Sequence, residues 1–124
     1  MTVGLVGSVV NGWLDGTFAT ATCFVKLHTA DPGAAGATAA AVGSATRVQA
    51  TMGAAAAGSK AMTSMASTWT NGGTSETLSH ISLWTAAAAG AVNATGALTA
   101  SQAWVSTNTF TLTSLSIAIT PIAV

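Results

Sequence analysis

Residues 19–28 read ATATCFVKLH, and their hydrophobic side chains recur at every second position. A row at 21, 23, 25 and 27 alternates with a second row that includes Lys26 and His28. A period of two is typical of a β-strand with one face buried in a core. We therefore predict a strand here, with Cys23 on its buried face and His28 on the solvent face.

The predicted strand is followed by a turn at Asp31, Pro32 and Gly33. An Asp side chain accepts hydrogen bonds from nearby backbone, proline fixes φ, and glycine permits a positive φ. We expect these three residues to form a structural turn.

Similar signals recur along the rest of the chain. Further strands are predicted at residues 47–52, 77–85, 91–99, 103–105 and 110–119. At 60–69, Met62 and Met65 suit a helix, whereas the Thr and Ser content and Trp69 favour a strand, which is our prediction. Asn71-Gly72-Gly73 is a hairpin or loop signal. The apolar positions change parity at residues 113–114, which predicts a bulge or tight turn there, and Pro121 is predicted to end the last strand.

Residues 3–18 predict a short amphipathic helix, because Leu5, Val9, Trp13 and Leu14 recur at helical spacing and Gly16 is a natural stop. At 124 residues and 12.0 kDa the chain has room for one core. We predict one mainly β domain over 1–124, a β-sandwich or jelly-roll-like fold. Residues 1–18 form its helix and turn, and residues 19–124 form the sandwich.

Charge is scarce. Only 5% of the residues are Asp, Glu, Lys or Arg, and three bases cancel three acids; roughly 25% is usual. So few cations make no surface for nucleic acid or an anionic membrane, and no apolar run approaches the length of a bilayer span. Because a neutral monomer tends to associate, we expect most copies to be part of a larger assembly.

The residues that perform chemistry are few and dispersed. His28, His80 and Asp31 match no metal-ligand spacing, and a Cys23–His80 pair places a buried thiol beside no obvious base. The sequence therefore predicts no catalytic residue, no metal and no cofactor.

Tryptophan is the one notable residue type that remains, with four copies that could serve in a core, at an interface or as a carbohydrate platform. We select Trp69, Trp84 and Trp104 as candidate interface anchors.

Several motifs recur in an order known from phage proteins. The stretch VKLHTADPGAAG at residues 25–36 resembles the LHTxDPGxxG segment of small phage virion proteins described as head decoration, minor capsid, head fibre or tail fibre proteins. The other matching segments are VNGWLD at 10–15, TRVQA at 46–50, LSHISLW at 78–84 and GALTAS at 96–101. The chain departs from that pattern by lacking a glutamate at 39–42, an aromatic before Arg47 and an acid at Thr85.

The resemblance implies a non-enzymatic homotrimer, made in the host cytoplasm and attached to the exterior of the virion. It favours a capsid decoration or minor capsid protein that binds the major capsid protein and stabilises the assembled lattice. The alternative is a tail or fibre module that contacts the host surface through loops on a β scaffold.

Overall fold

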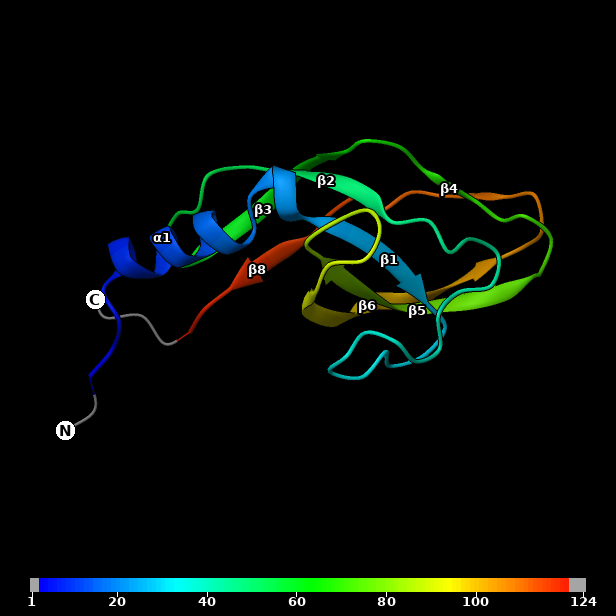
Figure 1. Cartoon of the computed structure of the whole chain (residues 1–124), viewed down its shortest axis with the longest axis horizontal. Coiled ribbons are helices and arrows are strands. Elements are labelled where there is room, and N and C mark those ends of the chain that lie inside the picture. Colours follow the sequence, from blue (N-terminus) through cyan, green and yellow to red (C-terminus); the bar gives the residue numbers. More distant parts are fainter. Residues whose placement is uncertain (1–2, 121–124) are drawn as a thin grey trace.

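The computed structural model describes residues 3–120 and confirms a mainly β chain that begins with one short helix (Figure 1). Helix α1 spans Gly7–Thr17, and a single 3-10 turn follows at Thr20–Thr22. The strands are β1 Phe24–His28, β2 Val48–Met52, β3 Ser59–Met65, β4 Trp69–Thr70, β5 Glu76–Trp84, β6 Val92–Trp104, β7 Thr109–Phe110 and β8 Ser116–Ala118. Over the described residues, no helix has the length and apolar character that a bilayer crossing requires.

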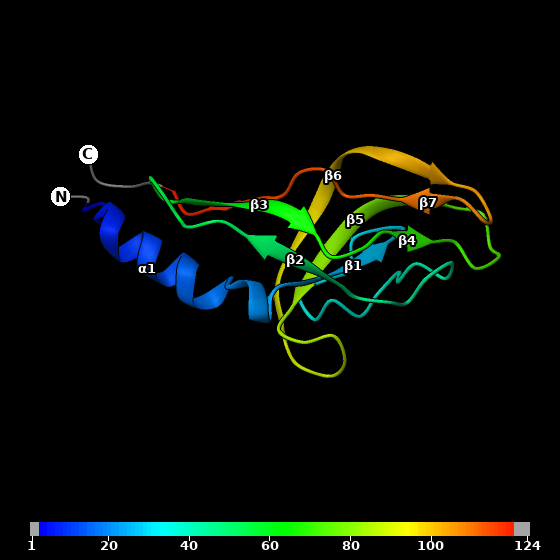
Figure 2. The same ribbon diagram turned by 90° about the horizontal axis from the view of Figure 1, so that it is seen from above.

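The larger sheet has six strands in the order β6-β5-β1-β2-β3-β8, and every neighbouring pair is antiparallel. Strand β1 lies inside the sheet and pairs with β5 over its whole length, from Phe24 opposite Trp84 to His28 opposite His80. The sheet curls (Figure 2). Residues of both edge strands, β6 and β8, line one common hollow. Strands β4 and β7 form a separate ribbon at the end away from α1.

The alternation in residues 19–28 correctly identifies the buried face of β1, because Cys23, Val25 and Leu27 are all fully buried. The prediction of a solvent-exposed His28 is wrong, since this side chain is also fully buried. The cause is the following loop, which folds back over the end of the strand. Thr29 N–H donates to the Ala39 carbonyl at 2.9 Å, which closes the loop over the imidazole.

Strand β5 buries residues of both parities. Leu78 lies on one predicted face, Ile81 and Leu83 lie on the other, and all three are buried. The pairing of β5 with β6 shifts between Leu78 and His80, and such a bulge turns the remainder of the strand over. The core therefore receives apolar side chains from both halves of β5.

Strand boundaries differ from the predictions in the second half of the chain. The two predicted strands at 91–99 and 103–105 are one strand, β6, which pairs with β5 on both sides of a register shift, at residues 92–97 and at 102–104. The predicted 110–119 strand is divided into β7 and β8 with a non-strand segment at 111–115, which agrees with the expected interruption near 113–114. The predicted stop at Pro121 lies outside the described residues.

The Asn71-Gly72-Gly73 segment forms a loop, and it joins β4 to β5, which belong to different sheets. The Asn71 side chain is buried and donates to the Thr74 and Trp104 carbonyls at 2.6 and 2.8 Å. This loop therefore ties the small β4–β7 ribbon to the end of β6.

Candidate functional site

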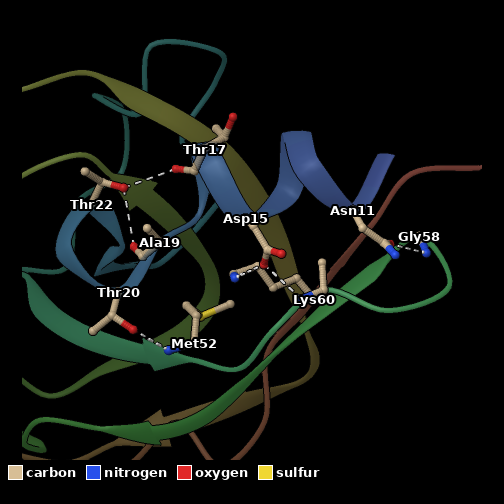
Figure 3. Close-up of polar contacts among 10 residues, drawn as sticks. Asn11, Asp15, Thr17, Ala19, Thr20, Thr22, Met52, Gly58 and Lys60 are labelled. Carbon is tan, nitrogen blue, oxygen red and sulfur yellow. Dashed lines mark hydrogen bonds and ion pairs between the residues drawn. The ribbon is translucent and has the colours of Figure 1, made fainter. Parts of the chain in front are cut away.

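Helix α1 packs on the sheet through Val10 and Leu14, both buried, and through polar contacts beside them (Figure 3). The Asp15 carboxylate accepts from Lys60 Nζ at 2.5 Å and from Ala55 N–H at 2.9 Å. The Lys60 hydrogen bond, with the Ala55 amide, holds the pKa of Asp15 below its ordinary value. Lys60 is only 5% exposed, and this carboxylate is its ion-pair partner.

A second polar contact comes from the middle of the helix. The side-chain oxygen of Asn11 accepts from Gly58 N–H at 3.0 Å (Figure 3). Beyond the end of α1, the Thr20 hydroxyl accepts from Met52 N–H at 2.9 Å. The inner side of the helix is thus bonded to the loop before β3 and to the end of β2.

The outer side of α1 is apolar and exposed. Leu5 is 40% exposed, Val6 60%, Val9 44% and Trp13 54%. The sequence analysis grouped Leu5, Val9 and Trp13 with Leu14 as one hydrophobic face, and the structure divides that group. The buried pair is Val10 and Leu14, whereas the row of Leu5, Val9 and Trp13 faces solvent. The signal that could have revealed two faces is that apolar residues cover nearly two thirds of the helical wheel, more than one contact requires.

A buried polar chain runs through the centre of the sheet. His28 Nδ1 lies 2.9 Å from the Thr38 carbonyl, which can only accept, so this nitrogen carries the hydrogen. His28 Nε2 therefore accepts, and the Ser82 hydroxyl donates to it at 2.7 Å. Ser82 in turn accepts from the Trp84 indole N–H at 2.7 Å. Each of these groups has its partner inside the chain.

The Ser82–His28 contact has the distance of a nucleophile and its base, but its surroundings do not suit that reaction. Both residues are fully buried, and the second imidazole nitrogen is bonded to a backbone carbonyl in place of a carboxylate. Burial also lowers the pKa of His28, so that the ring stays neutral. The arrangement is that of a satisfied core histidine.

The other candidate chemical groups do not converge. His80 lies opposite His28 in the sheet, while Asp31 is exposed and its carboxylate accepts from Gly33 N–H at 2.9 Å. Cys23 precedes β1 and His80 pairs at its other end, about 16 Å away for five residues of strand. Burial raises the pKa of the Cys23 thiol. Among residues 3–120 no cluster of three His, Cys, Asp or Glu side chains could hold a metal ion.

Two of the three predicted tryptophan anchors belong to the core of this chain. Trp69 and Trp104 are each 1% exposed. The Trp69 indole donates to the Thr46 carbonyl at 2.9 Å, and its ring centre lies 6.0 Å from that of Phe110. The Trp104 indole donates to the Asn108 carbonyl at 3.0 Å. These rings hold the β4–β7 ribbon and the end of β6 in place and do not lie on the surface.

Trp84, the third predicted anchor, is half-buried and also holds parts of its own chain together. The Arg47 guanidinium lies 3.6 Å from the centre of the ring and donates to the Ala86 and Ala89 carbonyls in the β5–β6 loop. On the 29–41 loop, a Cβ at Gly36 would approach the Trp84 ring to 3.0 Å. Arg47, Trp84 and Gly36 thus fasten two loops to the sheet.

The predicted turn at Asp31, Pro32 and Gly33 is a local structural feature. The Asp31 side chain bonds the backbone two residues ahead, Gly33 adopts φ +68°, and Pro32 is buried. The turn lets the 29–41 loop fold back over His28.

A hollow of about 650 Å³ lies between β6 and the segment that links β7 to β8. Its apolar walls come from Met62, Ile81, Leu98, Phe110 and Leu115, and none of its lining residues is ionisable. A groove of this kind can hold apolar groups but supplies no acid or base.

Two comparisons with known proteins bear on this structure. No curated protein matches the chain. The family model described as "Podophage GP4 fiber I protein gp80" matches residues 5–120, which span α1 and every strand of both sheets. The chain therefore belongs to this family of phage virion structural proteins, the podophage GP4 fiber I protein gp80 family.

Proposed function

We propose that this protein is a non-enzymatic structural subunit of a phage fibre, which works by packing against neighbouring proteins in the virion. The observation that carries the proposal is the family match over residues 5–120. Because the match includes the helix, both sheets and the loops between them, the fibre role applies to the whole described domain.

The chemistry of the structure supports a role without catalysis. The large groove is lined by no ionisable residue, and the buried Ser82–His28 pair is fully occupied by internal hydrogen bonds. The acids Asp15, Asp31 and Glu76 are engaged in structural contacts: an ion pair, a turn, and the amides of residues 42 and 43. An enzyme needs free titratable groups that converge on one space.

Of the two roles that the sequence predicted, the fibre module has the stronger support, because the family description names a fibre protein. Capsid decoration, with the major capsid protein as partner, is the second candidate. It rests on the resemblance of residues 25–36 to the LHTxDPGxxG segment. Either role fits a chain whose surface carries few charges and whose exposed apolar side chains gather on α1.

The test is the copy number and position of this chain in purified virions. Quantitative mass spectrometry against the major capsid protein should find a few dozen copies, and immunogold labelling should place them on fibres. Hundreds of copies spread over the head would replace the fibre role with capsid decoration. Virions that contain no copies would refute both.

Deletion of the gene separates the roles by phenotype. A fibre subunit predicts particles that keep their heat tolerance and lose fibres and adsorption. A decoration protein predicts particles that adsorb normally but release their genome at lower temperature, because its binding energy adds to the stability of the lattice.

A further inference from the structure

The strands at the two ends of the large sheet open onto one groove. Sheet order places β6 at one end and β8 at the other. The hollow of about 650 Å³ beside β6 and a second hollow of about 300 Å³ share the lining residues Ile81, Ala97, Leu115 and Ser116. The two hollows are therefore parts of one groove, which runs along β6 on one side and along residues 110–118 on the other.

The backbone on the two sides of this groove lacks strand partners. An edge strand presents a row of N–H and C=O groups that no neighbouring strand bonds. The pairing of β6 with β5 also skips residues 98–101, which lie beside the groove and pair with no residue of β5. Among residues 3–120, no backbone hydrogen bond joins 97–102 to 110–116 across the groove. Both sides therefore offer hydrogen-bonding groups to a strand placed between them.

The side chains of the groove are apolar or uncharged. Ile81 and Leu112 are 6% and 8% exposed, whereas Leu98 and Leu115 are only half-buried. The more exposed lining residues are Ala, Gly, Ser, Thr and Gln, and no lining residue is ionisable. A charged side chain would lose water here without meeting an opposite charge. The groove therefore suits an uncharged segment whose apolar side chains alternate toward it.

We propose that the groove binds an extended, uncharged segment of another virion protein, which adds as a strand between β6 and residues 110–118. Strand addition obtains affinity from main-chain hydrogen bonds and specificity from the side chains that alternate into the groove. The added strand closes the curled sheet and covers both of its open edges. A small apolar ligand would fill the hollow but would leave the backbone of both edges unpaired.

The donor is a different protein, because insertion requires a strand with both sides of its backbone free. Each of the eight strands in residues 3–120 already pairs on at least one side within its own sheet. A second copy of the chain could supply one of these strands only by breaking its own sheet. An extended segment of a neighbouring protein meets the requirement without that cost.

The inference rests on the proposed fibre function and adds the kind of partner to it. It is tested in virions assembled with the full chain, in which a photoreactive diazirine analogue of leucine replaces Leu98, a residue that lines the groove. Irradiation should join position 98 to one uncharged segment of another virion protein, identified by mass spectrometry of the cross-linked peptides. The same analogue at Val42, which is 74% exposed and outside the groove, is the control and should not give this product.

A pair of lysine variants tests the same groove without a cross-linker. Ala100→Lys places a charge among the lining residues, whereas Ser101→Lys places it on the next residue, which does not line the groove. Both positions are exposed, so both purified chains should melt as the wild type does. Virions made with Ala100→Lys should retain fewer copies by roughly tenfold or more, because an edge lysine opposes strand addition. Virions made with Ser101→Lys should retain the wild-type number.

Ala100→Lys virions with the full number of copies would overturn the inference, and so would virions that contain the chain but give no cross-link from position 98. A cross-link from position 98 to a second copy of the chain would overturn the assignment to a different protein. If the chain is found on fibres in the expected number and no such cross-link forms, only the groove partner is wrong and the fibre function stands. If virions lack the chain, the fibre function fails and the inference fails with it.

Discussion

The centre of the large sheet and the outer face of α1 differ in which groups they expose to water. In the centre, His28, Ser82 and Trp84 are polar groups withdrawn from water, and each has a hydrogen-bond partner in the chain. Among the described residues, no buried side-chain nitrogen or oxygen lacks a partner. On α1, apolar side chains that would gain from burial are left in water, with Trp13 54% exposed.

The difference separates the requirements of folding from those of assembly. The centre of the sheet is complete in one chain, so changes there should alter the stability of the monomer. The outer face of α1 contributes little to the monomer, so changes there should alter what the chain binds. Each prediction below compares a residue of one region with a residue of the other or with a neutral control.

The largest effect is expected at the buried tryptophans. Trp69→Ala removes a ring that is 1% exposed and should lower the free energy of unfolding by about 3–5 kcal/mol. Trp13→Ala should cost less than about 1 kcal/mol in the same experiment. Urea unfolding of the dilute chain, where assembly is absent, measures both. If both variants lose the same free energy of unfolding, the outer face of α1 contributes as much to the stability of the monomer as the core does.

A smaller loss is expected when the buried polar chain is cut at its middle. Ser82→Ala leaves His28 Nε2 without a partner in a fully buried position and removes the partner of the half-buried Trp84 indole N–H. The expected cost is about 1–3 kcal/mol. Ser101→Ala, on the exposed part of β6, is the control and should stay within about 0.5 kcal/mol. If Ser82→Ala leaves the free energy of unfolding unchanged, the chain of hydrogen bonds adds nothing to stability.

The same chain predicts a dependence on pH. Burial keeps the pKa of His28 in the fold below its unfolded value of about 6.5, so the unfolded chain takes up a proton first. Stability is therefore complete above that pH and decreases as pH falls below it, by at most about 1.4 kcal/mol per pH unit. Urea unfolding between pH 7.5 and pH 5 measures the slope.

The control for the pH prediction is His28→Asn, which should be less stable at neutral pH but should lose the slope. Asp15 does not interfere, because its pKa is lowered and its contribution is present above the ordinary Asp value of about 3.9. That contribution disappears only as pH falls further, through the lowered pKa. A slope that persists in His28→Asn would assign the effect to another group.

Periodicity was informative wherever a single contact decides which residues are buried. It correctly predicted strands at β1 and β2 and an interruption of the last predicted strand, which lies at 111–115. It was wrong for His28, because the covering loop comes from residues 29–41 and no local pattern records where a loop folds back. It also missed the continuity of β6, a 13-residue strand that pairs with the 9-residue β5 at both ends.

For the candidate site, the sequence patterns predicted even less of which side chains are exposed. Aromatic residues as anchors were a sound physical expectation, but sequence could not rank four tryptophans by exposure. The two that proved buried depend on long-range contacts, such as Trp69 with Thr46 and Phe110. Trp13 was classified with the buried side of its helix, because apolar residues surround most of α1 and periodicity alone cannot say which row meets the sheet.

The smallest predicted effect is a change in monomer stability at Gly16, on the outer face of α1, and it is compared with a change at Gly36 beside the sheet. Gly16→Ala adds a methyl group on the outer face of α1, where no atom lies within 4 Å. Alanine restricts the unfolded chain and favours helix, so the dilute monomer should gain about 0.5–1 kcal/mol in urea unfolding. A matched change at Gly36, where φ is +63° and a Cβ would lie 3.0 Å from the Trp84 ring, should instead destabilise the chain. If Gly16→Ala also destabilises the monomer, the glycine serves the fold of the chain, and the outer face of α1 is not separate from the requirements of folding.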